Sequence, residues 1–424
     1  MTEYTISTDN TYYFEGTGRH TIARDTYGGL HVVYAKGTSY RSQIFYAKSI
    51  DNGVTWENTQ LTNISDGDQL RPSIVVDSNN VIHVVWLFSE YMESETIYQI
   101  CYMKYLSSWS DISYFTSDDW NNYFSNNNVD IAIDSFNNLH LVWDGEEYNV
   151  SEDKWYYYIR YKKFDTDWGD TQNIVSVASV HQTNPTIAID SNDVLHIVWF
   201  NNGNFDTPSQ LHYINYNSEW SSIEEITDTE DIFYFSGNTL LIVDKNNYLH
   251  FSFSGIHAGY YSNRSQVFYI TRTTSWQSLQ ILTTSSSQNS TFYSMAVDEN
   301  NYIYLFYLSK NHYYSTPRYV DYKIYISSWG NAQHLFQEQG EEDNIRLIWA
   351  NFPVINGTNI NRPKMKYVLI YNKTNSLVFY YPTDFEWNSI LTLAIKTING
   401  LPIANIKTIN GLPRASMKTF NGLS

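Results

Sequence analysis

One phrase of the sequence recurs six times, and it constrains the fold more than any other feature of the chain. Each copy has an apolar run that ends in Asp, a polar turn, and a second run of the kind Leu-His-x-Val-Trp. The aspartates that open the turns are 52, 57, 56, 54 and 54 residues apart, at Asp25, Asp77, Asp134, Asp190, Asp244 and Asp298. A near-constant period of this size indicates an array of similar supersecondary units.

Each period predicts four antiparallel strands. Two strands flank the Asp turn, a third follows as an alternating Tyr-rich run, and a fourth begins near a Trp. Aromatic residues make up 17% of the chain, which favours strands over helices. We therefore expect an all-β fold, a β-propeller of four-stranded blades over residues 1–386.

The number of blades depends on the two ends of this region. A weaker seventh copy follows the six clear ones, with runs that begin at Ile345, Lys364 and Ser376. The N-terminal run would add an outer strand to that last blade and close the ring, which removes exposed sheet edges. Seven blades are the favoured interpretation and six are the alternative.

The repeated polar residues are expected to be structural. Equivalent positions of separate blades lie around a ring, too far apart to share one metal ion. We therefore expect the five repeated histidines to be buried and to hydrogen-bond the backbone, with no metal site and no cofactor. The aspartates are expected to cap their turns, and the tryptophans of the fourth strands to pack between blades. The fourth turn position is Gly, Asn or Asp in every copy, and these residues tolerate a positive φ.

Charge and cysteine content exclude several classes of protein. The net charge is −18, so a nucleic-acid partner is not expected. The single cysteine, Cys101, cannot form an intramolecular disulfide. The sequence has no run of apolar residues long enough for a membrane span and no conventional signal peptide. We therefore expect a chain that is made in the cytoplasm.

Residues 49–56 resemble a known motif. Ser49, Asp51, Gly53, Thr55 and Trp56 match the Asp-box, or BNR repeat, of the sialidase-superfamily β-propellers. The resemblance implies a sialidase-like fold, with this segment as a structural turn away from any active site. In that family an arginine triad binds the substrate carboxylate, and an Arg-Ile-Pro phrase comes early in the propeller.

The activity of that family is not expected here. The nearest phrase in this chain, Leu-Arg-Pro, supplies Arg71 but lacks the Ile. We therefore assign no catalytic residues and expect a binding protein rather than an enzyme.

One end of the propeller is the expected ligand surface. The connections between second and third strands, and those between blades, meet at this end, and they are rich in aromatic residues. Such residues can stack on sugar rings, so we expect contact with a glycan or a host receptor. The candidate ligand residues are Arg71, Tyr40, Tyr91, Tyr148, Phe205, Tyr260 and Tyr313.

Residues 387–424 form a tail of different composition. The tail has no Asp or Glu, and an 11-residue repeat places lysines at Lys396, Lys407 and Lys418. Each unit turns at Asn-Gly, a strong hairpin signal. The repeats resemble those of phage structural proteins and microbial surface proteins. We expect the tail to attach the propeller to other virion or surface proteins, or to a second copy of the chain.

These features together predict a non-enzymatic display propeller on a virion, such as a phage fibre or decoration protein, or on an extracellular surface. A sialidase-like exo-glycosidase and a protein-interaction propeller are the alternatives.

Overall fold

The computed structural model describes strands and turns along most of the chain. The described residues are 2–8, 13–15, 20–37, 41–65, 67–92, 95–115, 126–149, 153–175, 180–202, 209–227, 234–256, 264–283, 288–298, 301–311, 318–337, 347–348, 369–373, 376–381, 397–398, 401–402, 408–409 and 412–413. These residues form an all-β fold, as expected, and contain no helix that could span a membrane.

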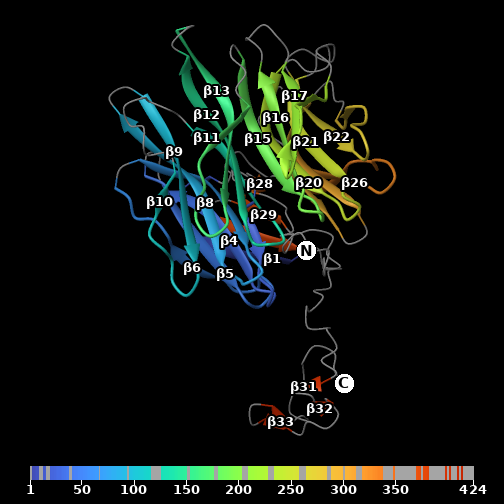
Figure 1. The fold of residues 1–424 in the computed structure, drawn as a ribbon. Helices are drawn as coiled ribbons and strands as arrows, with labels where there is room; N and C mark the ends of the chain where they lie inside the picture. Colours follow the sequence, from blue (N-terminus) through green and yellow to red (C-terminus); the bar gives the residue numbers. More distant parts are fainter. Residues whose placement is uncertain are drawn as a thin grey trace.

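Six consecutive sheets each carry one copy of the repeat, and these are the blades of a β-propeller (Figure 1). Blade 1 contains β2 (Tyr13–Glu15), β3 (Ile22–Arg24), β4 (Leu30–Gly37), β5 (Gln43–Ser49) and β6 (Glu57–Gln60). Blade 2 contains β7 (Asp68–Val76), β8 (Ile82–Met92), β9 (Glu95–Tyr105) and β10 (Ser113–Tyr114). Blade 3 contains β11 (Asn126–Ile133), β12 (Leu139–Asn149), β13 (Lys154–Phe164) and β14 (Gln172–Val175).

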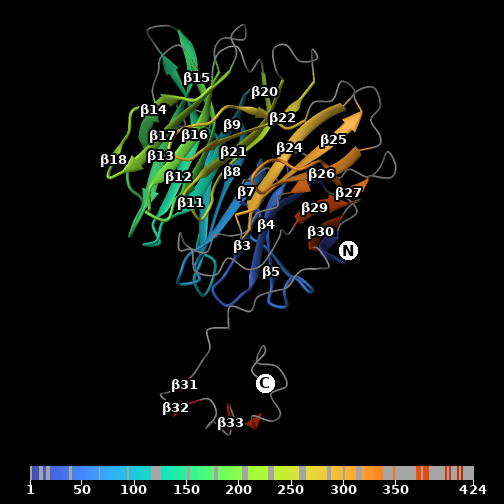
Figure 2. The same ribbon diagram turned by 90° about the vertical axis from the view of Figure 1, so that its right-hand side faces the viewer.

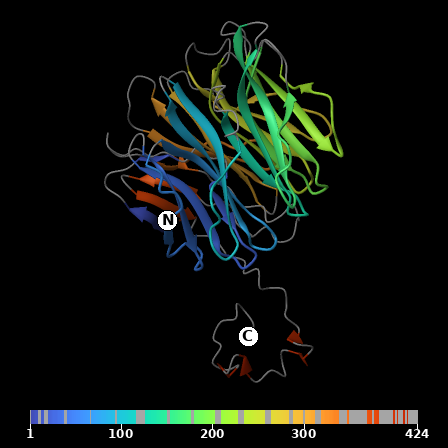
Figure 3. The same ribbon diagram turned by 60° about the vertical axis from the view of Figure 1, so that its left-hand side comes forward.

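The other three repeat blades follow the same order. Blade 4 contains β15 (His181–Ile189), β16 (Leu195–Asn202), β17 (Gln210–Asn217), β18 (Glu219–Trp220) and β19 (Glu224–Glu225). Blade 5 contains β20 (Tyr234–Val243), β21 (Leu249–Ile256), β22 (Gln266–Arg272) and β23 (Gln280–Ile281). Blade 6 contains β24 (Gln288–Val297), β25 (Ile303–Asn311), β26 (Arg318–Tyr325) and β27 (Gln333–Gln337). The blades follow one another around a common centre (Figure 3).

A further four-stranded sheet joins the two ends of the propeller. Its order is β1 (Thr2–Thr8), β30 (Ser376–Tyr381), β29 (Leu369–Lys373) and β28 (Leu347–Ile348). The N-terminal run is its outer strand, as expected, and the sheet lies between blade 6 and blade 1 (Figure 2). Six blades therefore carry the repeat, in agreement with the alternative count. The favoured count of seven includes this sheet, which carries only the weaker copy and lacks the Asp-turn-Leu-His phrase.

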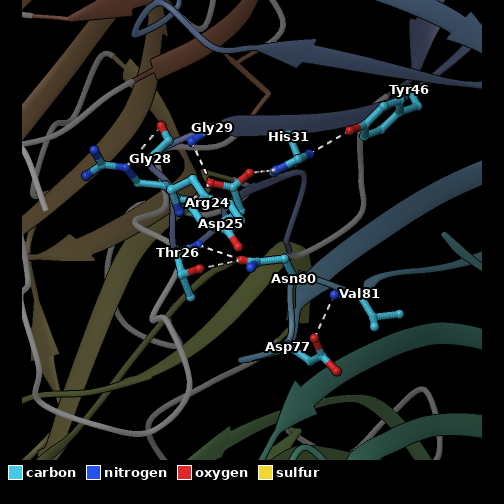
Figure 4. A network of polar contacts seen from close by, with 11 residues as sticks. Arg24, Asp25, Thr26, Gly28, Gly29, His31, Tyr46, Asp77, Asn80 and Val81 are labelled. Carbon is cyan, nitrogen blue, oxygen red and sulfur yellow. Dashed lines mark hydrogen bonds and ion pairs between the residues drawn. The ribbon is translucent and has the colours of Figure 1, made fainter. Parts of the chain in front are cut away.

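The five repeated histidines are buried, as expected, but the expected bonding partner is wrong. Each imidazole bonds side chains rather than the backbone. In blade 1, His31 Nδ1 lies 2.6 Å from the Tyr46 hydroxyl, and His31 Nε2 lies 3.1 Å from Asp25 Oδ2 (Figure 4). The His–Tyr part of this Asp–His–Tyr relay recurs in blades 2 to 5, with Nδ1 to hydroxyl distances of 2.6 to 2.8 Å. The Asp–His hydrogen bond recurs only in blade 3, at 3.2 Å, whereas in blades 2, 4 and 5 the Asp oxygen lies 3.6 to 4.0 Å from a buried Nε2 that has no described hydrogen-bond partner. The tyrosine comes from the third strand, outside the repeated phrase.

The outer tryptophans pack between blades, as expected. The tryptophans of blades 2 to 6 each meet, edge to face, the relay tyrosine of the preceding blade. Trp109 lies 5.1 Å from Tyr46 between ring centroids, and Trp329 lies 4.8 Å from Tyr269. The relay of one blade is thus covered by the fourth strand of the next.

The turn aspartates cap their turns, as expected, and the turns also join neighbouring blades. Asp25 Oδ1 accepts hydrogen bonds from the backbone N–H groups of Tyr27 and Gly29. Thr26 donates its backbone N–H and its hydroxyl to Asn80 Oδ1 of the next blade, both at 2.8 Å (Figure 4). Asn80 has a φ of 63°, and the equivalent residues of every repeat also have positive φ. Equivalent contacts run from blade to blade as far as blade 6.

Residues 49–56 of blade 1 form a compact turn. Asp51 Oδ1 accepts from the Ser49 hydroxyl at 2.8 Å and from the Thr55 backbone N–H at 2.9 Å. The Trp56 indole donates to the Gly53 carbonyl at 2.8 Å, and Gly53 has a φ of 84°. The carboxylate therefore holds the turn between β5 and β6.

The described part of the tail contains two short hairpins. They are β31 (Thr397–Ile398) with β32 (Leu401–Pro402), and β33 (Thr408–Ile409) with β34 (Leu412–Pro413). Lys396, Lys407 and Lys418 lie outside the described residues.

Candidate functional site

Arg71 is the one predicted ligand residue whose side chain the structure describes. Tyr40, Phe205, Tyr260 and Tyr313 lie outside the described residues. Tyr91 and Tyr148 belong to β8 and β12, but their side chains are outside the described set. The structure therefore does not bring the predicted set together, and the site is built from other residues.

Arg71 lies in a bulge of the first strand of blade 2. It has a φ of 52°, and Asn128 and Asn184 have φ values of 51° and 55° at the matching bulges of blades 3 and 4. Arg71 donates to Asn128 Oδ1 at 3.3 Å. Asn128 in turn donates its amide to Asp144 Oδ1 at 2.9 Å.

Asp144 connects this chain of contacts to blade 4. Besides Asn128, its Oδ1 accepts the backbone N–H of Asn184 at 3.0 Å. The Asp144 side chain is buried, with only 2% of the residue exposed. The matching positions of the other blades hold uncharged residues: Ala35, Leu87, Phe200, Ser254 and Leu308. A buried carboxylate at a position that is otherwise uncharged is a departure from the repeat that packing alone does not require.

The neighbouring end of blade 4 contains three buried polar atoms without a hydrogen-bond partner among the described residues. They are His181 Nδ1, Gln182 Nε2 and Asn201 Oδ1. Gln182 and Asn201 face each other across β15 and β16, and His181 precedes Gln182. Gln182 Oε1 is already used, because it accepts the Trp199 indole N–H at 2.5 Å. We call His181, Gln182, Asn201 and His212, together with Tyr157, the blade 4 cluster.

The two histidines of this cluster contact aromatic rings. The His181 ring lies 5.7 Å from Tyr156 and 5.5 Å from Tyr157, both of β13. His212 lies edge-on to Trp199 at 5.7 Å, and its Nε2 is 3.3 Å from the Asn201 amide nitrogen. Imidazole, amide and phenol groups therefore lie at the end of blade 4 that adjoins blade 3.

Burial keeps the titratable groups of the cluster uncharged near neutral pH. Burial lowers the pKa of His181. Burial also lowers the pKa of His212, although the nearby Glu225 carboxylate acts in the opposite direction. The pKa of Tyr157 is raised to about 12, first by burial and then by the charges of Glu146 and Asp144. The cluster thus offers neutral donors and acceptors beside two carboxylates.

Arg160 lies on the other face of blade 3. It is paired with Trp143 across β12 and β13, and it donates to Asn126 Oδ1 at 3.4 Å and to the Glu146 carbonyl at 3.3 Å. A Cβ atom at Gly145 would lie 2.8 Å from this guanidinium, so the glycine makes room for it.

Sequence reasoning missed this site because it looked for ligand residues in the loops. The available signal was the comparison of equivalent strand positions. Opposite the last residue of the phrase stand Phe45, Cys101, Arg160, His212, Phe268 and Asp321. Blades 3, 4 and 6 carry ionisable polar side chains where blades 1 and 5 carry Phe, and one of these residues, His212, belongs to the blade 4 cluster.

Known proteins resemble this chain in structure only. No protein-family model matches the chain, and no curated protein matches it. The structure of an ulvan lyase, a polysaccharide lyase of family 25, is 8% identical, with a TM-score of 0.57 over 89% of this chain and 94% of the lyase. The structure of an ulvan lyase of this family bound to a chain of glucuronic acid and sulfated rhamnose has a TM-score of 0.56, 8% identity, and covers 88% and 96%.

A Hadza microbial sialidase is 11% identical, with a TM-score of 0.46 over 72% of this chain and 67% of the sialidase. At these identities the likeness to the lyases shows a shared fold and nothing finer. The chain has a β-propeller fold similar to that of these lyases.

Proposed function

We propose that the protein binds a glycan at the blade 4 cluster. The observation that carries the proposal is that one end of β15 and β16 holds three buried polar atoms without described partners: His181 Nδ1, Gln182 Nε2 and Asn201 Oδ1. Buried polar groups almost always have hydrogen-bond partners, so three at one end of a blade favour a ligand or the water that a ligand replaces.

Sugar hydroxyls match the chemistry of these atoms. Each hydroxyl can both donate and accept, while Gln182 Nε2 donates, Asn201 Oδ1 accepts, and a neutral imidazole nitrogen can do either. The rings of Tyr156 and Tyr157 beside His181 add amphipathic surface of the kind that packs on sugar rings. The fold shared with polysaccharide lyases is consistent with a glycan ligand.

The test is a glycan array with the full chain, followed by titration calorimetry with the strongest ligand. Asn201→Ala should weaken binding by about tenfold, since it removes one buried hydrogen bond. The matched control is Asn217→Ala. Asn217 is exposed and lies at the end of β17 that is distant from the cluster. Equal affinities for the two variants, or an array without ligands, would contradict the proposal.

We propose further that glycan binding serves display on a virion or cell surface, with residues 387–424 as the attachment element. The two short hairpins in the repeat tail support this, because the outer edges of a two-stranded sheet can pair with another chain. A particle that incorporates the truncated chain as well as the full chain would contradict this role.

A glycan-cleaving enzyme is the second candidate. The ring contact between His181 and Tyr157 favours it, because both residue types act as general acids or bases in enzymes. The assay is incubation with the strongest array ligands and with a fluorogenic sialoside, followed by chromatography of the products. Turnover that is lost in His181→Ala would favour lyase-like or hydrolase chemistry at the cluster. Sialoside turnover that is lost in Arg71→Ala would favour the sialidase-like alternative.

A further inference from the structure

We infer that the blade 4 cluster accepts an uncharged sugar and discriminates against sugars that carry a carboxylate or a sulfate. The inference rests on the proposed function and names the ligand class of the same site.

The first reason is the chemistry of the buried groups that have no described hydrogen-bond partner. His181, Gln182 and Asn201 offer an imidazole and two amides. None of these is a fixed cation, and His181 is neutral near pH 7 because burial lowers its pKa. Recognition of carboxylate or sulfate normally uses a charged guanidinium or ammonium group.

The second reason is the position of two carboxylates beside the cluster. Asp144 reaches β15 itself, because it accepts the backbone N–H of Asn184, two residues beyond Gln182. Glu146 lies on the same face of β12 as Asp144, since alternate residues of a strand share a face, and it is paired with Tyr157 of the cluster. An anionic sugar at this place would lose water next to two charges of its own sign.

The third reason is that the described cations of this region are directed elsewhere. Arg160 shares the face of Trp143, which packs against Val85 and Leu87 of blade 2. The opposite face, with Val142, packs against Ile197 and Trp199 of blade 4. Arg71 donates a hydrogen bond to Asn128, which lies in the matching bulge of blade 3. The two carboxylates also act on the Tyr157 hydroxyl, because burial and then the charges of Glu146 and Asp144 raise its pKa.

The experiment compares neutral sugars with acidic counterparts. The full chain is titrated with galactotetraose against tetragalacturonate, and with N-acetyllactosamine against its sialylated form. We expect the uncharged member of any pair that binds to bind at least about tenfold more tightly, because a like charge opposes the acidic member. Glu146→Gln should narrow this ratio several-fold. The control is Glu224→Gln in β19, an exposed carboxylate that should leave the ratio unchanged.

The outcomes separate a failure of the charge discrimination from a failure of the proposed glycan binding. Equal or tighter binding of the acidic members overturns the inference but leaves glycan binding intact. A ratio that Glu146→Gln does not change also overturns it, because the named carboxylate would then not cause the discrimination. If no member of either pair binds, the array ligands are tested in matched acidic and neutral forms. A protein that binds no glycan at all overturns both.

Discussion

Replacement of His31 by Phe should destabilise the propeller more than the same replacement of His83. Both histidines are buried, and both bond a tyrosine hydroxyl, at 2.6 Å for His31 and 2.8 Å for His83. They differ in the second contact. His31 Nε2 is 3.1 Å from Asp25 Oδ2, whereas His83 Nε2 is 4.0 Å from Asp77 Oδ2 and has no hydrogen-bond partner among the described residues.

The magnitude follows from the groups that each variant leaves unpaired. Loss of the bond to Tyr46 or Tyr102 leaves one buried hydroxyl, at a cost of about 1.5 kcal/mol. His31→Phe also leaves Asp25 Oδ2 without its imidazole, and a hydrogen bond to a charged group contributes about 2 kcal/mol. We therefore expect losses of about 3.5 kcal/mol for His31→Phe and about 1.5 kcal/mol for His83→Phe.

The assay is urea unfolding followed by tryptophan fluorescence and, separately, by circular dichroism, so that a departure from two-state behaviour is detected. The double variant His31→Phe with Asp25→Asn isolates the pair energy in a mutant cycle. Equal losses for the two single variants would refute the reasoning, because the geometry of the Asp contact would then have no energetic consequence.

The stability lost in His31→Phe should depend on pH. Burial alone would raise the pKa of Asp25, but the His31 hydrogen bond and charge and the N–H groups of Gly29 and Tyr27 lower it overall. A carboxyl group whose folded pKa is depressed stabilises the fold above its unfolded pKa, and that stability is lost as pH falls through the folded value. The difference in unfolding free energy between wild type and His31→Phe should therefore shrink below about pH 4. A constant difference down to the lowest accessible pH would contradict the relay.

Three further predictions concern other parts of the chain. Asp51→Ala should lower the free energy of unfolding by about 1 kcal/mol without a change in glycan affinity, because the carboxylate holds a turn; a large affinity loss at unchanged melting temperature would contradict this. Asp144→Ala should cost about 3 kcal/mol, since it leaves the N–H groups of Asn128 and Asn184 unpaired. Asp144→Asn, which keeps an acceptor, should cost clearly less in the same unfolding assay. Deletion of residues 388–424 should leave the melting temperature of the propeller and its glycan affinity unchanged; a collapse of either would show that the tail is part of the domain.

The repeat made most of the fold predictable because its signals are local. A positive φ at the fourth turn position follows from the Asn, Asp or Gly found there, and Asn80 at 63° and Gly28 at 93° have it. The partners of the histidines could not be predicted in the same way. Tyr46 and Tyr102 lie on the third strand, and strand register brings them to the imidazole only after the sheet has formed.

The site was harder to predict for a different reason. The sequence contains many Tyr and Asn residues in its loops, so composition directed attention there. The residues of the blade 4 cluster are in strands, and Gln182 and Asn201 each have a buried atom without a described partner, a property that Gln182 shares with Gln69 of blade 2. That property depends on packing between blades and cannot be read from the sequence. Asp144 was the sequence signal that pointed to this region, because a carboxylate replaces an uncharged residue within an otherwise regular repeat.

The most direct test of the central claim is a crystal structure of the full chain with the strongest glycan-array ligand bound. Glycan binding at the blade 4 cluster predicts sugar hydroxyls within hydrogen-bond distance of Gln182 Nε2 and Asn201 Oδ1, with a ring of the sugar against Tyr156 or Tyr157. A glycan that is bound elsewhere, with these atoms paired only to water, would contradict the claim.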